Sequence, residues 1–350
     1  MLTRFTDKFV QRVAFVIMLC MVMAACSDSD DDAVGTEDVS VAFTLTVADA
    51  ASTRAENEGW DDYSPAQDGI LNENLVNTDD IIIAIYDDKG NKIDNVEDLR
   101  VTAVSDPSIT GATMYAITGV WKNAKFNVDK AKRVMVIANS NVSTWGDPSQ
   151  LTYDLNQGTR KYIPMWGVVK IPATFTLGKQ NKLPNIQMLR AMAKVSVKLR
   201  TDMAEYGYSI GSMSVNNYNT KGYCVPKTFN EVDNTSEVRF ANSLNVLDSH
   251  ADIIALPTTA PLYLPEYDNS GAYPTTITVN LNRNGSLEGT YTLEFRNYDS
   301  DGKPTGSTYP IQRNHYYQYL IYKETGKIIV TLHVRKWNRR IYPENEGIIM

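Results

Sequence analysis

Apolar and polar residues alternate with a period of two along much of the chain after residue 38. In the clearest case, small or polar side chains separate five apolar ones, which are Val39, Val41, Phe43, Leu45 and Val47. This alternation predicts a strand with one face buried and the other towards solvent. We therefore expect the folded part of the chain to begin with a half-buried strand at Val39–Val47.

Further short apolar or alternating runs predict more strands. We expect them at Ile81–Tyr86, Met114–Val120, Arg133–Ala138, Ala173–Leu177, Ala193–Leu199, Thr276–Asn282, Thr290–Phe295, Tyr316–Tyr322 and Ile328–Val334. Turn-forming residues such as Asn284-Gly285 separate these runs. Helical periodicity is scarce, and Asp129–Lys132 predicts one turn at most. Many short strands at this spacing predict an all-β fold of antiparallel β-sandwiches.

The extreme N-terminus carries a different pattern. Three basic residues precede residues 13–25, which are uncharged and too short to span a membrane as a helix. Residues 1–25 therefore predict a secretory signal peptide. The stretch MAAC that ends at Cys26 resembles the lipobox of bacterial lipoproteins, which implies cleavage before Cys26 and lipid on its thiol. An ordinary signal peptide that ends near a cysteine is the alternative.

Length and composition predict how the mature chain is organised. Residues 26–38 are polar and acidic, which predicts a disordered tether. This acidic stretch also resembles the surface-export signal of lipoproteins in some Gram-negative anaerobes, which favours the outer face of the outer membrane. The remaining length exceeds the usual size of one core. A polar, turn-rich stretch at Gly178–Pro184 then divides the chain into predicted domains at residues 39–182 and 183–350.

Charge and cysteine content exclude several classes of function. Residues 1–25 carry three basic groups and one acidic group, so the mature chain has 31 basic and 40 acidic residues and a net charge of −9. This balance argues against a nucleic-acid partner, which requires clustered Lys and Arg. Cys20 leaves with the signal peptide and Cys26 would carry lipid, so Cys224 has no cysteine to pair with. We expect Cys224 to be a small buried residue rather than a nucleophile.

The sequence lacks a motif for catalysis, a metal or a cofactor. His250, His315 and His333 have no second ligand at metal-binding spacing, and no HExxH, CxxC, GxSxG or phosphate-binding loop occurs. Glu266 and Glu294 could be imagined as an acid–base pair, but ordinary acidic residues are the better interpretation in so acidic a chain. We therefore expect no enzyme activity and no cofactor. The high tyrosine content suits strand faces, or a surface that binds carbohydrate or protein.

Several segments resemble one family when they are taken in order. They are RVMVIAN at 133–139, IPMWG at 163–167, LRAMAKVSV at 189–197, NYNTKGYCVP at 217–226, LYLPEY at 262–267, YPIQRNHYY at 309–317 and the final strand that ends at Trp337. Together they resemble FimA-like fimbrillins, the subunits of type V pili, over nearly the whole mature chain. The resemblance implies two transthyretin-like β-sandwich domains, export as a lipoprotein, and polymerisation with other pilus subunits outside the cell.

The resemblance also gives a meaning to the polar loop after the first strand. Family members are activated by an arginine-specific, trypsin-like protease at such a loop, and Arg54-Ala55 lies in this one. Cleavage after Arg54 would make Ala55 the new N-terminus and release residues 26–54, lipid included. Our hypothesis is that Val39–Val47 is a removable strand, whose place is taken by a strand from another subunit.

Alternatives remain open at this stage. The segment after Trp337 contains Pro343 and Gly347 and lacks clean alternation, so we expect a mediocre donor strand, which leaves stalk and tip subunits both open. A lipid-retaining basal anchor is a third option, against which the Arg54 loop argues. Two other classes are a non-polymerising surface lipoprotein that binds glycan or a host or bacterial receptor, and a secreted enzyme or glycan-binding partner of a nutrient-uptake system.

Overall fold

The computed structural model describes residues 36–47, 71–105, 113–141, 151–155, 162–226, 229–231, 238–240, 254–256 and 261–336. Cys26, Arg54, Ala55, Trp337 and the segment after it lie outside these residues. The described part is built from strands, with one five-residue α-helix, α2 (Thr201–Glu205). It also contains the short 3₁₀ helices η1 (Leu71–Asn74), η2 (Ala124–Phe126) and η3 (Val128–Lys130). The prediction of an all-β fold is confirmed.

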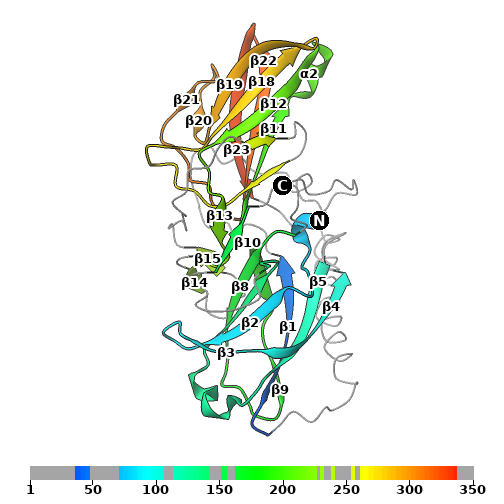
Figure 1. The fold of residues 1–350 in the computed structure, drawn as a ribbon, viewed down its shortest axis with the longest axis vertical. Coiled ribbons are helices and arrows are strands. Elements are labelled where there is room, and N and C mark those ends of the chain that lie inside the picture. The colour runs from blue at the N-terminus through cyan, green and yellow to red at the C-terminus, as the bar shows by residue number, and fades with distance from the viewer. Residues whose placement is uncertain are drawn as a thin grey trace, which may run out of the picture.

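One large sheet holds nine strands in the order β3-β2-β6-β8-β10-β1-β5-β4, with β9 paired to β1. These strands are β1 (Val39–Val47), β2 (Ile81–Tyr86), β3 (Lys92–Asn95), β4 (Glu97–Ser105), β5 (Thr113–Trp121), β6 (Arg133–Ala138), β8 (Met165–Lys170), β9 (Gln180–Lys182) and β10 (Ile186–Arg190). The first strand of the fold thus lies inside the sheet and not at its edge (Figure 1).

Two four-stranded sheets form the other end of the elongated molecule (Figure 1). One has the order β17-β11-β22-β23, with β11 (Ala193–Leu199), β17 (Leu262–Leu264), β22 (His315–Glu324) and β23 (Lys327–Lys336). The other has the order β16-β12-β18-β19, with β12 (Tyr208–Asn216), β16 (Ile254–Leu256), β18 (Thr276–Arg283) and β19 (Ser286–Glu294). A core cluster formed by residues of both sheets, among them Val195, Val215, Val279 and Tyr319, lies between them.

Three two-stranded ribbons complete the described strands. They are β7 (Thr152–Asp154) with β13 (Lys221–Tyr223), β14 (Phe229–Glu231) with β15 (Val238–Phe240), and β20 (Asn297–Tyr298) with β21 (Pro304–Thr305). The chain passes from the large sheet to the second group at Ala191 and Met192, because β10 still belongs to the first sheet and β11 to the second. The division into domains at residues 182 and 183 stays a prediction.

The large sheet is buried on both faces at its centre. Val134 and Val136 of β6 belong to one core cluster, together with the apolar residues of β1. Met135 and Ile137 of the same strand belong to another cluster, which also contains Tyr263 and Tyr316 from the second group of strands. Burial on both faces gives near-continuous apolar runs such as the one in β6, and such runs are easy to recognise in a sequence.

One predicted strand is wrong. Residues 173–177 have no ladder partner, although Phe175 is buried and packs edge-on against Trp121 with ring centroids 6.3 Å apart. The Asn181 side chain satisfies this backbone in place of a neighbouring strand, because it accepts from Thr176 N at 2.8 Å and donates to Thr176 O at 3.0 Å. Apolar and polar residue types alternate in this loop as they do in a strand, which led to the wrong prediction. In the described ranges, no helix has the length and apolar character needed to cross a membrane.

Candidate functional site

The position of β1 in the large sheet bears directly on the hypothesis that this strand is removable. One edge of β1 pairs antiparallel with β5, from Val39 opposite Trp121 to Thr46 opposite Met114. Its other edge pairs in parallel with β9 over residues 40–42 and with β10 over residues 45–47. Both edges of β1 are therefore bonded to strands that lie far away in the sequence. We call the place between β5 on one side and β9 and β10 on the other the β1 seat.

The five apolar residues predicted to face inward from β1 are buried in one core cluster. They are Val39, Val41, Phe43, Leu45 and Val47, of which Val47 is 3% exposed and the other four are 0% exposed. The prediction of their inward face is confirmed at the level of burial. The prediction that β1 is only half-buried is wrong, because Ala42, Thr44 and Thr46 on the opposite face are also buried. Their small side chains leave room for the neighbouring segments to cover that face.

A polar contact joins this second face of β1 to the segment between β9 and β10. Thr44 Oγ1 donates a hydrogen bond to Asn185 Oδ1 at 2.8 Å, and Asn185 Nδ2 donates to Thr46 Oγ1 at 2.9 Å. Leu183 N donates to Ala42 O at 2.9 Å and holds the same segment against β1. Asn185 was not predicted to have a role, because the polar residues just before it indicated a boundary between domains. The alternation of threonines in β1 was the one signal that could have found this contact.

The entry to β1 is also held by polar contacts. Lys125 Nζ lies 2.6 Å from Glu37 Oε1, and Lys125 N donates to Glu37 O at 3.1 Å. Asp38 accepts hydrogen bonds from Asn123 N at 2.8 Å through its side chain and from Gly178 N at 2.8 Å through its carbonyl oxygen. Glu37 and Asp38, the last two residues of the predicted tether, are therefore bonded to the folded part of the chain.

The wall of the β1 seat is connected to a buried polar network between the sheets. β10 ends at Arg190, which is 0% exposed. Its guanidinium donates to Glu73 O at 3.1 Å and to Asn314 Oδ1 at 2.8 Å, and it also bonds the side chain of Asn74. Glu73 and Asn74 belong to η1, the first described element after β1. Arg190 therefore joins the wall of the seat to η1 and to the second group of strands.

The carboxylate of Glu73 is the centre of this network. Lys194 Nζ lies 2.8 Å from Glu73 Oε1, and the Tyr263 hydroxyl donates to the same oxygen at 2.5 Å. Glu73 is fully buried and Lys194 nearly so, so each charge depends on its partners for stabilisation. Burial, and then the nearby charge of Glu73, raises the pKa of Tyr263 well above its ordinary value. The network holds η1 against β11 and β17 at the junction.

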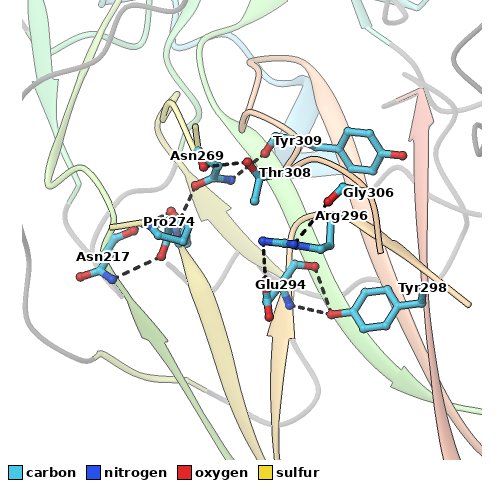
Figure 2. Close-up of polar contacts among 10 residues, drawn as sticks. Asn217, Asn269, Pro274, Glu294, Arg296, Tyr298, Gly306, Thr308 and Tyr309 are labelled. Carbon is cyan, nitrogen blue, oxygen red and sulfur yellow. Dashed lines mark hydrogen bonds and ion pairs between the residues drawn. The ribbon is translucent and has the colours of Figure 1, made fainter. Parts of the chain in front are cut away.

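The two carboxylates that could have formed an acid–base pair are each paired with an arginine. Glu266 Oε2 lies 2.6 Å from Arg313 Nη2, and this arginine also donates to Cys224 O at 2.9 Å. Burial has the largest single effect on the pKa of Arg313 and lowers it, but the charge of Glu266 and its hydrogen bond, together with smaller effects of other neighbours, raise the pKa overall. Figure 2 shows Glu294 with Arg296, whose Nη2 lies 2.8 Å from Glu294 Oε2. These contacts give both glutamates a structural role.

The remaining candidates from the sequence are located as follows. Cys224 is fully buried in a core cluster, as predicted. His315 and His333 are half-buried, and His250 lies outside the described residues. Among the residues that the structure describes, no three His, Cys, Asp or Glu side chains gather in a way that could hold a metal ion. Lipidation at Cys26 and cleavage between Arg54 and Ala55 remain predictions.

The fold matches solved structures of fimbrial proteins. The chain is similar to the tip fimbrial protein Mfa3 from Porphyromonas gingivalis, solved with a C-terminal truncation, at 16% identity over 86% of this chain and 100% of that one, with a TM-score of 0.51. It is also similar to a fimbrial assembly protein from Parabacteroides distasonis, at 14% identity over 85% of this chain and 99% of that one, with a TM-score of 0.50.

The chain therefore has the fold of fimbrial proteins, and the predicted resemblance to fimbrillins is confirmed at this level. Both solved structures are named for fimbrial proteins and not for enzymes. No model of a protein family matches the sequence, and no curated protein does.

Proposed function

We propose that this chain is a structural subunit of a surface pilus that assembles by exchange of strand β1 after proteolysis. The single observation that carries the proposal is that β1 is buried on both faces and bonded along both edges. The fold shared with two fimbrial proteins supports the pilus setting. The proposal covers a stalk or a tip subunit, and in either position the chain would contribute to adhesion.

Because β1 is buried, its removal costs a large amount of free energy. Five inward apolar side chains contribute about 1.5–3 kcal/mol each, or roughly 7–15 kcal/mol together as an upper bound. That is comparable to the stability of a whole domain. An empty β1 seat would also leave the facing edges of β5, β9 and β10 with unpaired backbone groups. Such a seat strongly favours the binding of another strand, which restores the ladder and the apolar contacts.

Covalent attachment decides which strand occupies the seat. While β1 is joined to the rest of the chain, it competes at high effective concentration and prevents exchange. A cut after Arg54 by an arginine-specific protease removes that advantage. In this proposal the precursor is exported as a lipoprotein and held at the outer membrane by lipid on Cys26. Cleavage then releases residues 26–54 and leaves the subunit in an extracellular fimbrium.

The decisive experiment maps the N-terminus of the protein taken from intact filaments. We expect mass spectrometry to find Ala55 as the first residue. Arg54→Ala should leave full-length, membrane-bound monomer and abolish the ladders of polymer on gels of unboiled samples. Arg54→Lys keeps the charge and should give the same loss, because an arginine-specific protease does not cut after lysine.

The same samples separate the proposed function from its main alternative. A non-polymerising lipoprotein that binds glycan or a surface receptor would keep Cys26 as its lipidated N-terminus and would show no ladder. Normal polymer from Arg54→Ala would show that strand exchange at this loop is wrong.

A further inference from the structure

The face of β1 opposite its apolar residues carries side chains that are bonded to one amide. Thr44 is 3% exposed and Thr46 is 7% exposed. Asn185 accepts from the first hydroxyl at 2.8 Å and donates to the second at 2.9 Å. Because side chains two residues apart in a strand lie on the same face, one amide contacts both hydroxyls at once. Asn185 therefore forms hydrogen bonds at two positions of the strand that occupies the seat.

The backbone around Asn185 is fixed on both sides. Before it, Leu183 N donates to Ala42 O at 2.9 Å. After it, Ile186 pairs with Leu45 in parallel register, and the pairing continues to Met188 opposite Val47. The amide is therefore fixed at one position along the strand axis, and it cannot move to keep its hydrogen bonds with a strand that binds in another register.

The position of the Asn185 amide can distinguish strand registers that alternating apolar residues alone cannot. A slip of one residue would turn the apolar side chains away from the core and is excluded by burial. A slip of two residues keeps the apolar face inward and would bring the Ala42 methyl group to a position where a hydroxyl is bonded. The amide would then lose a hydrogen-bond partner at a mostly buried site, which is unfavourable.

We propose that Asn185 is a specificity-determining residue of the β1 seat. Its partner would be a strand of another pilus subunit that carries Ser or Thr at two positions two residues apart, on the face opposite its apolar residues. This inference rests on the proposed function, since it describes the strand that replaces β1. It also fixes the register, with the hydroxyl pair towards the end of the strand that lies against β10.

The first test measures the coupling between Asn185 and the hydroxyls in the uncut full-length chain. The double substitution Thr44→Val and Thr46→Val keeps side-chain shape, and we expect it to lower the folding equilibrium constant about tenfold. In an Asn185→Leu background the same pair should leave the constant unchanged or raise it, because the hydroxyls have lost the amide as a partner and valine removes them from a buried site. Ser40→Val is the matched control, since Ser40 lies half-buried on the same face. Equal effects in both backgrounds would overturn the proposal.

The second test follows exchange itself. The full-length chain is cut after Arg54 by an arginine-specific protease in the presence of a labelled synthetic peptide with the sequence of residues 39–47. We expect this peptide to bind about tenfold more tightly than one that carries valine at positions 44 and 46. The peptide with valine at position 40 should bind like the unchanged peptide, and Asn185→Leu should remove the preference.

The outcomes separate this inference from the proposed function. Exchange of all three peptides with equal affinity would contradict the role of Asn185 while leaving strand exchange intact. Binding of none of them to a chain that has been cut would contradict the proposed function, and the inference about a partner strand would fall with it.

Discussion

At the scale of single residues, two buried tyrosines of the second group of strands differ in the hydrogen bonding of their hydroxyl groups. The Tyr263 hydroxyl donates to the buried carboxylate of Glu73 at 2.5 Å. The Tyr319 hydroxyl is buried and has no hydrogen-bond partner in the described part of the chain. Both rings are fully buried, so the comparison isolates the hydroxyl group.

We expect opposite results when each of these hydroxyls is removed. Tyr263→Phe should lower the free energy of unfolding by about 1.5–3 kcal/mol, because it removes a hydrogen bond to a buried charge. Tyr319→Phe should leave stability unchanged or raise it by up to about 1 kcal/mol, because an unsatisfied polar group is removed. Urea denaturation of the two variants checks both values, and an equal loss in both would contradict this account of the junction.

At the scale of elements, the position of β10 depends on a glycine in β8. A Cβ atom at Gly167 would lie 2.7 Å from Gln187 O and 2.8 Å from the Ile186 side chain. The backbone of β10 therefore approaches β8 as closely as it does only because position 167 has no side chain. Since β10 forms one wall of the β1 seat, this glycine also positions the seat. It is the last residue of the IPMWG segment on which the family resemblance partly rests.

Gly167→Ala should push β10 outward and destabilise the uncut chain by about 1–3 kcal/mol. Gly271→Ala is the matched control, because a Cβ atom there meets nothing within 4 Å. Thermal unfolding of the two variants measures the difference. A Gly167→Ala protein as stable as the control would mean that β10 can shift without cost.

The elements also show which strands a sequence can predict. Four strands with a strong apolar face, β1, β2, β6 and β11, were predicted with their observed bounds. The buried strands β8 and β10 were not predicted. β4 was missed because it is an edge strand whose residues are mostly exposed or half-buried. The seat itself could not be predicted, since its walls β5, β9 and β10 are brought to β1 by long-range pairing. Glu73 and Arg190 looked like ordinary charged residues, because nothing near them in sequence indicates their burial.

At the scale of the whole molecule, buried tyrosines make stability depend on alkaline pH. Burial raises the pKa of Tyr319 and Tyr263 well above the ordinary value and that of Tyr298 to about 12. In Figure 2 the Tyr298 hydroxyl lies against the backbone of Glu294, from which it accepts a hydrogen bond at 2.6 Å. The native state thus keeps these protons at a pH where the unfolded chain has lost them.

At alkaline pH the native state binds more protons than the unfolded state, so the free energy of unfolding falls as pH rises. The contribution of these tyrosines to the free energy of unfolding is complete below about pH 10, which is the pKa of tyrosine in the unfolded chain. Above that pH it falls by up to about 1.4 kcal/mol per pH unit for each such tyrosine. Urea denaturation at several pH values, followed by tyrosinate absorbance, checks the prediction. Tyr298→Phe should reduce the slope, whereas a flat stability curve through this range would contradict it.

The pairing of β1 has a consequence for the order of events during synthesis. Thr44 and its partner Asn185 are 141 positions apart, and β1 pairs in parallel with β9 and β10. The large sheet cannot close until the chain has emerged as far as Arg190. Contacts of such long range are typical of slow folding. If the chain is exported as proposed, with its N-terminus first, the five apolar side chains of β1 have no partner strands until β9 and β10 have also crossed the membrane. β1 is therefore synthesised before all the strands with which it pairs.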